Sequence, residues 1–369
     1  MPMKYDVVIV GSGPAGQIAA ETILSKSSMS VLIIDANPED YEKPCGGGIP
    51  NDCLKEFPFL KRIVRHKTNE IVARYKDTDR PFPIEINMVP RMSMRKLLFR
   101  RLRSLDTPDL ALGYMFNTRV TKVKRKEHMV ILNDKFEVEY KWLIGADGVN
   151  SVVGKSIGFK IQKVPIIVAH AKVEPAIHKN TRCVIEFIED FRGYWWVFPK
   201  GCHSNIGLGG DVKGRILKQM FDERVKEHAK LGPFEEIYRS AHLIPSAYNT
   251  EQKPYQIDDG HILLCGDAAS FINSMTGEGI YYALVGGREA AQVILGERLL
   301  SEYPSFHEYL TRIQSLKNDL DKQSIKDAFD RIFCDERTSR DMVDFLFSHS
   351  IPKPKALSDD EKKAIYSKL

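Results

Sequence analysis

The chain has 369 residues, of which 43% are hydrophobic and 28% are charged. This composition is typical of globular proteins and excludes a disordered chain, and the length suits about two domains. The net charge of +5 permits contact with an anionic membrane surface without requiring it. No apolar run approaches the roughly 18 residues of a spanning helix, and the first apolar stretch stops at Gly11. We therefore expect a cytoplasmic protein, with peripheral membrane contact as an open alternative.

The first forty residues predict a strand, a glycine-rich turn, a helix and a second strand. A β-branched run at 5–10 leads into Gly11-Ser-Gly-Pro-Ala-Gly16, and a helix then extends to about Lys26. The second strand, at 31–34, ends at Asp35. Glycines in such a turn let the backbone approach a pyrophosphate, and the helix N-terminus supplies free N–H donors. The acidic residue after the second strand completes the pattern of a dinucleotide-binding site.

Strand-forming segments dominate the middle of the chain and predict a mostly antiparallel sheet inserted into the first domain. These segments are 166–173, 184–187, 194–199 and 205–209. A strand at 261–265 then returns to the nucleotide-binding pattern and precedes a long helix at 279–297. After Pro304 the chain is predicted to be helical and increasingly charged.

Two later segments indicate a flavin rather than a nicotinamide nucleotide. The first is Gly145-Ala-Asp-Gly148, and the second combines Cys265-Gly-Asp-Ala-Ala269 with Thr276-Gly-Glu-Gly-Ile280. A carboxylate at the end of a strand can accept hydrogen bonds from ribitol hydroxyls. The positive end of a helix that begins after Gly-Glu-Gly would stabilise an anionic reduced flavin.

From Met3 to about Ile294, these segments match in order the flavin-binding motifs of the p-hydroxybenzoate hydroxylase superfamily, which the chain resembles. The resemblance implies FAD as cofactor, with Asp35 at the adenosine ribose and Asp267 at the ribitol. For Asp147, an alternative role in bracing its own turn stays open. The cofactor-binding residues implied are Gly11, Gly13, Ala15, Gly16, Asp35, Ala36, Cys45, Gly46, Gly48, Arg91, Val120, Asp147, Gly266, Asp267, Gly277, Gly279 and Ile280.

Two further motifs resemble those of the geranylgeranyl reductase family, which reduces isolated double bonds of isoprenoid chains. They are Lys43-Pro-Cys-Gly-Gly-Gly-Ile49 and Tyr194-Trp-Trp-Val-Phe-Pro-Lys200, the latter followed by Gly207-Leu-Gly209. Alternate residues of a strand share one face, so Tyr194, Trp196 and Phe198 are predicted to form an aromatic surface suited to a polyprenyl substrate. The alternative is that these rings only seal two domains against each other.

Cys45 is the first candidate for a catalytic residue. The resemblance implies that it lies near the reactive face of the flavin, where a thiol can donate a proton to an alkene. Tyr194 is the second candidate, with a higher intrinsic pKa. A small packed thiol without a proton role is the alternative for Cys45.

We therefore expect an α/β protein with a Rossmann-like FAD-binding domain, an inserted mostly antiparallel β-sheet substrate domain and a helical C-terminal region. The predicted FAD-binding domain comprises 1–70, 90–160 and 255–300. The predicted substrate domain comprises 71–89 and 161–254, and the helical region comprises 301–369.

The expected activity is reduction of isoprenoid C=C bonds by hydride transfer from reduced flavin N5. Two alternatives stay open: an FAD-dependent monooxygenase or halogenase acting on an apolar or aromatic substrate, and a non-catalytic flavoprotein that binds lipid or senses redox state. The expected partners are an isoprenoid lipid and an external electron donor. Because the sequence has a single dinucleotide-binding motif, NADPH, ferredoxin and a reduced quinone all stay open as the donor. The cysteine spacing predicts no metal site, and we expect no nucleic-acid partner.

A basic helix is predicted at about 92–105. Its cationic residues could face an anionic lipid surface, or they could form an ordinary solvated face. The cations concerned are Arg95, Lys96, Arg100, Arg101 and Arg103.

Overall fold

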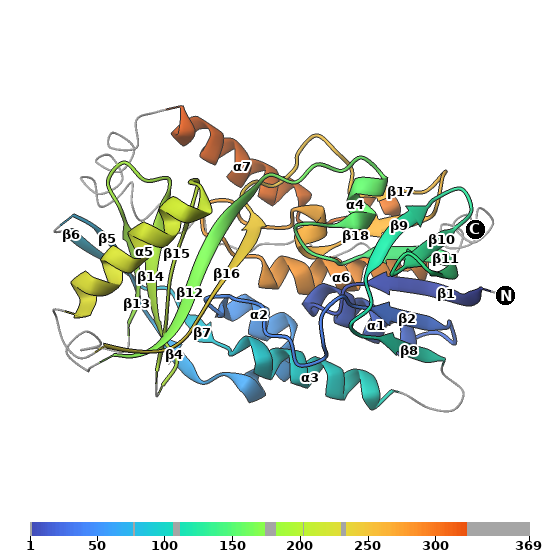
Figure 1. Cartoon of the computed structure of the whole chain (residues 1–369), viewed down its shortest axis with the longest axis horizontal. Coiled ribbons are helices and arrows are strands. Elements are labelled where there is room, and N and C mark those ends of the chain that lie inside the picture. Colours follow the sequence, from blue (N-terminus) through green and yellow to red (C-terminus); the bar gives the residue numbers. More distant parts are fainter. Residues whose placement is uncertain are drawn as a thin grey trace.

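The structure is a computed structural model that describes residues 2–76, 78–105, 111–173, 182–201, 203–229 and 234–322. Within these residues the strands form three sheets, and Figure 1 shows the first sheet at the end of the molecule that carries the N-terminus and the second at the opposite end. The expected α/β class is confirmed. The expected domain boundaries stay a prediction.

The strands at the centre of the first sheet are parallel. As is typical of parallel sheets, they consist of continuous hydrophobic, mostly β-branched runs that are buried on both faces. Its main order is β17-β18-β11-β1-β2-β8, and the β9–β10 hairpin joins β11. The strands are β1 (Met3–Val10), β2 (Val31–Ile34), β8 (Leu112–Met115), β9 (Val120–Lys124), β10 (Met129–Leu132), β11 (Phe136–Gly145), β17 (Tyr255–Gln256) and β18 (Ile262–Leu264). The helices α1 (Pro14–Leu24) and α6 (Ile280–Ile294) pack against each other, and α3 (Arg91–Arg103) contacts α1.

The register of this sheet brings the predicted motifs to one edge. Val10 is paired with Ile34 on one side and with Gly145 on the other, and Gly145 is paired with Leu264. The turns that follow these four strands therefore lie next to one another, at the carboxyl edge of the parallel strands. Open α/β sheets bind their ligands at this edge.

The second sheet is antiparallel except where β13 and β5 run parallel, which confirms the predicted sheet type. Its order is β16-β12-β15-β14-β13-β5-β6. The strands are β5 (Ile71–Tyr75), β6 (Thr78–Phe82), β12 (Lys163–Val173), β13 (Cys183–Phe187), β14 (Gly193–Pro199), β15 (Ser204–Gly210) and β16 (Phe234–Pro245). The helix α5 (Gly214–Ala229) covers one face, where the rings of Trp195 and Phe221 lie 5.3 Å apart. The sequence analysis assigned no strand to 234–245, although β16 forms an edge of this sheet.

The third sheet was not predicted, because three-residue strands have too little periodicity to be recognised. It consists of β3 (Gly48–Pro50), β7 (Ile86–Met88) and β4 (His66–Thr68). The short helices α2 (Asn51–Glu56) and η1 (Pro58–Ile63) lie between β3 and β4 in the chain. This small sheet supports the loop around Cys45, since the N–H of Val89 donates to the carbonyl of Gly47 (2.8 Å).

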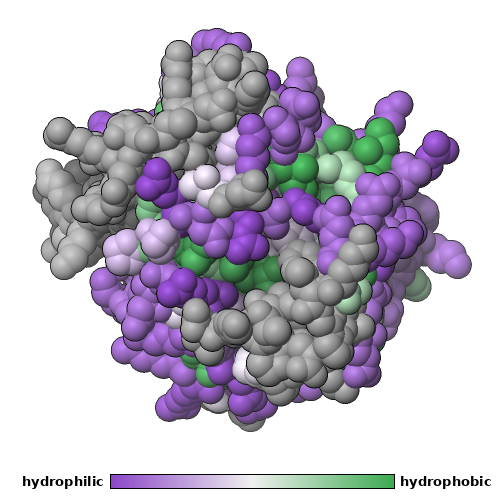
Figure 2. Space-filling model, turned by 90° about the vertical axis from the view of Figure 1, so that its left-hand side faces the viewer, coloured by the Kyte–Doolittle hydropathy of each residue, from purple (hydrophilic) through white to green (hydrophobic). Residues whose placement is uncertain are grey.

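The remaining elements are α4 (Val152–Ser156), η2 (Gly266–Ala269), η3 (Leu300–Glu302) and α7 (His307–Asp321). Arg192 Nη1 donates to Asp321 Oδ1 (2.5 Å), so the end of α7 is tied to the second sheet. Residues 323–369 of the predicted helical region lie outside the described residues. None of the described helices is both long and apolar enough to cross a lipid bilayer. Figure 2 shows an apolar area within a mostly polar surface, at the end of the molecule where β5, β6 and α5 lie.

Candidate active site

A cavity of about 920 Å³ extends among the described residues from the carboxyl edge of the first sheet to one face of the second. This volume lies within the usual range for cofactor and ligand sites. Every residue named above as cofactor-binding, catalytic or substrate-binding lines the cavity, with the exception of Gly16. A Cβ atom on Gly16 would lie 2.0 Å from the carbonyl oxygen of Gly11, so this glycine serves close helix–strand packing.

The glycine-rich turn is shaped for a close backbone approach. Gly11 has φ +102°, and a Cβ atom there would lie 2.2 Å from the carbonyl oxygen of Ala146. A Cβ atom on Gly13 would meet nothing within 4 Å, although Gly13 directly precedes α1. The turn therefore leaves open space at a helix N-terminus, as a pyrophosphate group requires.

Asp35 is buried and organises this turn from the end of β2. Its carboxylate accepts hydrogen bonds from the N–H of Ser12 (2.9 Å) and the N–H of Asn37 (2.8 Å). Arg95 lies over the same turn, where Nη1 donates to Ser12 O (3.0 Å) and Nη2 to Ser12 Oγ (2.9 Å). The sequence analysis did not assign Arg95 to the cofactor end of the cavity. The sequence feature that could have indicated this role is the position of Arg95 on the same predicted helix as Arg91.

The basic helix directs several of its cations toward the chain itself. Arg101 forms an ion pair with Glu21, and Arg103 forms one with Glu39 (2.6 Å). Together with the contacts of Arg95, these pairs give three of the five cationic side chains partners within the chain, so these three do not require a lipid surface. Exposed ion pairs of this kind contribute little to stability.

Asp147 follows β11 and contacts its own turn. Its carboxylate accepts from Ser151 Oγ (2.5 Å) and from the N–H groups of Val152 (2.7 Å) and Val153 (3.3 Å). Burial raises the pKa of this carboxyl, and these hydrogen bonds oppose the rise. The geometry favours the bracing role for the side chain, while the residue itself still lines the cavity.

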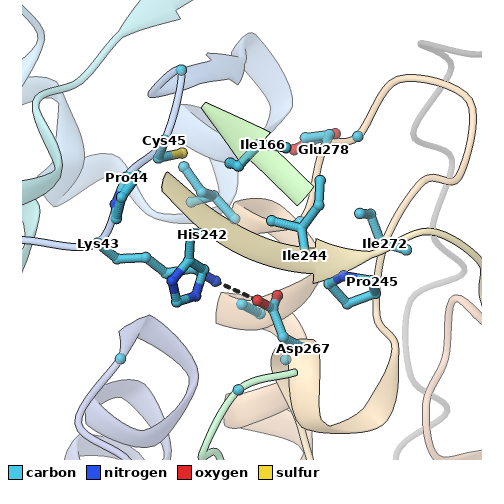
Figure 3. A pocket seen from close by; sticks show the side chains of 18 of the residues that line it. Lys43, Pro44, Cys45, Ile166, His242, Ile244, Pro245, Asp267, Ile272 and Glu278 are labelled. Atoms are coloured by element: carbon cyan, nitrogen blue, oxygen red, sulfur yellow. Dashed lines mark hydrogen bonds and ion pairs between the residues drawn. The ribbon is translucent and has the colours of Figure 1, made fainter. Parts of the chain in front are cut away.

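Asp267 follows β18 and forms an ion pair with Lys43, which the dashed line in Figure 3 marks. The side chain of His242, on β16, lies beside this pair. Burial, together with the positive charges of Lys43 and Arg91, lowers the pKa of His242 to about 4, so its imidazole is neutral near pH 7. The loop around Cys45 is thus held across the cavity from the predicted ribitol site.

The predicted aromatic face is present on β14. Tyr194 and Trp196 lie 5.9 Å apart and Trp196 and Phe198 lie 6.4 Å apart, measured between ring centroids. Gly207 is the cross-strand neighbour of Trp196, and a Cβ atom there would lie 2.0 Å from the indole ring. The glycine of the second motif therefore makes room for Trp196 to lie against β15.

Tyr194 connects the aromatic face to the loop before α6. Its hydroxyl donates to the carbonyl of Thr276 (2.5 Å), and burial raises its pKa well above the ordinary value. A phenol whose pKa is raised, and whose proton is already hydrogen-bonded to a carbonyl, donates that proton to a substrate less readily. The hydroxyl proton of Tyr194 is therefore engaged by the carbonyl of Thr276, and the catalytic roles of Tyr194 and Cys45 stay predictions.

The Cys45 loop is fixed by a residue that the sequence analysis missed. The side-chain amide of Asn205, which is fully buried, donates to the carbonyl of Cys45 (3.1 Å) and accepts from Trp196 Nε1 (2.8 Å). The N–H of Gly47 approaches Cys45 Sγ at 3.3 Å. Asn205 lies two residues before Gly207-Leu-Gly209 in the sequence. The strand pattern did not distinguish this position from an ordinary position in the core.

Glu278 lies between the two glycines that precede α6, and it lines the cavity. Burial, together with the negative charge of Asp52, raises the pKa of its carboxyl to about 8. The carboxyl is therefore mostly neutral near pH 7. A neutral group at this helix end leaves the positive helix terminus free to stabilise an anion.

These features define an FAD-dependent oxidoreductase: a phosphate-binding turn and acidic strand ends at one end of a cavity, and an apolar face at the other. The residues fit FAD because Gly13 leaves open space for a pyrophosphate before α1, Gly11 has a positive φ that a side chain would not allow, and Arg91 lines the same cavity. A family model described as an FAD binding domain matches residues 4–290, and the chain belongs to this family.

Curated relatives of the chain include several reductases. The chain is 31% identical over 304 residues to an uncharacterized protein of Methanosarcina barkeri, covering 79% of this chain and 74% of that protein. It is 29% identical to a geranylgeranyl diphosphate reductase of Rhodobacter capsulatus (79% and 75% covered). It is 27% identical to a digeranylgeranylglycerophospholipid reductase of Methanosphaera stadtmanae (86% and 82% covered). The expected relationship to geranylgeranyl reductases is confirmed.

Solved structures with the same fold include a reductase-like protein and a halogenase. A geranylgeranyl bacteriochlorophyll reductase-like protein of Thermoplasma acidophilum has a TM-score of 0.65 and 19% identity, covering 100% of this chain and 96% of that one. A myxobacterial chondrochloren halogenase has a TM-score of 0.68 and 13% identity, covering 99% and 97%. At these identities the likeness establishes the fold alone.

Proposed function

We propose that the protein saturates isolated C=C bonds of isoprenoid chains. The observation that carries this proposal is that one cavity holds the glycine turns, Cys45 and the aromatic face of Tyr194, Trp196 and Phe198. Curated relatives are named for the reduction of geranylgeranyl diphosphate and of digeranylgeranylglycerophospholipid, and this supports a polyprenyl substrate here.

FAD, when bound and reduced, supplies a hydride to one alkene carbon, and the protein must place a proton source at the other. An isolated alkene is a poor hydride acceptor, so alignment contributes much of the rate. Cys45 is our candidate for this proton source, because its loop is held by Asn205 and the residue lines the cavity. The S–H bond of Cys45 would break as the new C–H bond forms.

The remaining walls of the cavity suit an apolar chain. Aliphatic side chains from the second and third sheets line it and would keep water from the reacting carbons of a bound chain. They include Ile71, Ile86, Ile166, Ile185 and Ile244. Figure 3 shows Ile166 and Ile244 on the strands between Cys45 and Asp267.

A matched pair of cysteine variants tests the role of Cys45. Cys45 and Cys183 both line the cavity, but only the Cys45 thiol belongs to the glycine loop. We expect Cys45→Ala to keep its FAD and to lose at least ~100-fold in alkene reduction, the usual size of a general-acid contribution. Cys183→Ala should retain most of the activity. Equal rates in the two variants would remove Cys45 from the mechanism.

Oxygen dependence separates reduction from the alternative activities. A monooxygenase or halogenase would consume O₂ together with substrate, whereas a C=C reductase reoxidises its reduced flavin with substrate under anaerobic conditions. A non-catalytic flavoprotein would bind the lipid without either change. The external donor is tested in the same assay, by offering NADPH, reduced ferredoxin or a reduced quinone and following which one bleaches the flavin.

A further inference from the structure

A second, smaller cavity lies behind the Cys45 loop. Its lining includes Cys45, Lys200, His170 and Asn205, with Glu42 contributing from the loop before Cys45. Its volume of about 10 Å³ is close to the space that one water needs, and its polar lining suits a water. Cys45 is therefore approached by polar groups from this side and by apolar substrate-cavity groups from the other.

Lys200 is an unusual group in this place. It is the last residue of the motif that begins at Tyr194, and it is 5% exposed. Its ammonium lies 3.6 Å from Met88 Sδ, and a Cβ atom on Gly47 would lie 2.8 Å from Nζ. No carboxylate within the described ranges forms an ion pair with it. Burying an ammonium without a carboxylate costs stability, which suggests a function for the group.

The titratable groups that share the small cavity with Lys200 include His170, Cys45 and Glu42. Burial lowers the pKa of His170 and of His203, and the positive charge of Lys200 lowers both further. Asn205 Nδ2 lies 3.4 Å from His170 Nε2, and His170 Nδ1 lies 3.2 Å from His203 Nε2, as in a chain of neutral imidazoles. Burial also lowers the pKa of Lys200 to about 8, while Cys45, Cys183 and Glu42 oppose this shift. An ammonium with such a pKa can release its proton near neutral pH.

We propose that Lys200 is a positioning residue that stabilises the Cys45 thiolate and returns a proton to it after each reduction. This inference rests on the proposed function. In the step that uses it, the S–H proton of Cys45 goes to the alkene carbon and leaves a thiolate. An N–H bond of Lys200 then breaks as the S–H bond re-forms, and the neutral amine takes up a proton from water through the small cavity.

Two variants separate the charge of Lys200 from its proton. Lys200→Met removes both, whereas Lys200→Arg keeps a cation that does not deprotonate in proteins. Lys218→Met, on the exposed face of α5, is the control. All are made in the FAD-loaded protein. The first readout is the alkylation rate of Cys45 by iodoacetamide, followed by mass spectrometry of the peptide that contains Cys45. The second is the pH profile of alkene reduction.

We expect Lys200→Met to slow Cys45 alkylation by roughly three- to tenfold at near-neutral pH, because a nearby cation favours the reactive thiolate. Lys200→Arg should keep the alkylation rate, yet lose steady-state reduction and the pH dependence of the wild-type profile. Unchanged alkylation in Lys200→Met would overturn the inference, as would full reduction activity in Lys200→Arg. If the wild-type protein reduces no alkene but Lys200→Met still slows the alkylation of Cys45, the proposed function is wrong, whereas the interaction between Lys200 and Cys45 is supported.

Discussion

Asn205 and Cys45 are 160 residues apart in the chain, and the side-chain amide of Asn205 donates to the carbonyl of Cys45 (3.1 Å). Through its oxygen, the same amide accepts from Trp196 Nε1. One buried side chain therefore sets the distance between the loop that holds the proposed proton donor and the strand that holds the proposed substrate surface.

Replacing Asn205 tests this link. Asn205→Ala leaves a buried carbonyl and a buried indole N–H without this partner, so we expect a loss of about 2 kcal/mol in unfolding free energy. Alkene reduction should fall further than stability alone would explain, because the Cys45 loop loses its anchor. Trp196→Phe is the comparison variant, since it removes the indole donor and part of the ring but keeps the hydrogen bond from Asn205 to the carbonyl of Cys45. Chemical denaturation and turnover of both variants check the prediction, and equal activity in the two would contradict it.

Gly13 offers a test of cofactor binding that spares the fold. Its φ of −69° suits any residue, and a Cβ atom would point into open space, so we expect Gly13→Ala to keep the stability of the cofactor-free protein. The added methyl group would occupy the space that a pyrophosphate needs, and FAD affinity should drop by more than ~10-fold. Titration of the cofactor-free protein by flavin fluorescence measures this. Wild-type affinity would show that the cofactor lies elsewhere.

Gly207 tests the packing of the aromatic face. We expect Gly207→Ala to cost about 1–3 kcal/mol in unfolding free energy, because its Cβ atom would overlap the indole of Trp196. Gly214→Ala at the start of α5 is the control, since nothing lies within 4 Å of its Cβ position. Thermal denaturation compares the two. A Gly207 variant as stable as the control would mean that Trp196 is free to move aside.

Lys200 makes stability depend on pH in a defined direction. Its pKa is about 8 in the folded protein and about 10.5 when exposed, so the unfolded chain binds more protons between these values. This group therefore makes the folded protein more stable as the pH rises from about 8 to 10.5. At pH 7 the Lys200→Met variant should be more stable by roughly 3 kcal/mol, and the gain should vanish above about pH 10.5. Denaturation at both pH values checks this, and a gain that persists at high pH would contradict it.

Glu278 has the opposite dependence. Its carboxyl has a pKa of about 8 in the folded protein against 4.5 when exposed, so the folded protein binds more protons in between. Its contribution to stability is complete below about pH 4.5 and is lost as the pH rises to about 8. Glu278→Gln should flatten this part of the stability profile. A variant that loses stability over this range as steeply as the wild type would show that another group titrates there.

The parts of the fold that could be predicted share a local cause. Strand, glycine turn and helix follow one another within a few residues at Gly11, and the alternation at Tyr194, Trp196 and Phe198 fixed one face of a strand. The parallel order of the strands then brought turns from distant parts of the chain to one edge.

The parts that could not be predicted depend on contacts between distant segments. Arg95 reaches the turn at Ser12 across 83 residues, and Asn205 reaches Cys45 across 160. No periodicity within a single element encodes such pairs. The strand β16 was missed because its exposed edge position tolerates charged residues such as Glu235 and Glu236 among apolar ones.

The most direct test of the proposed activity is the mass of a polyprenyl substrate after one anaerobic reaction. The purified protein is loaded with FAD, reduced chemically and mixed with geranylgeranyl diphosphate or its glycerolipid, and the lipid is analysed by mass spectrometry. The account predicts products heavier by one or more pairs of hydrogen atoms, with reoxidation of the flavin. An unchanged lipid beside a fully loaded and reduced flavin, or a product that gains oxygen only in air, would contradict it.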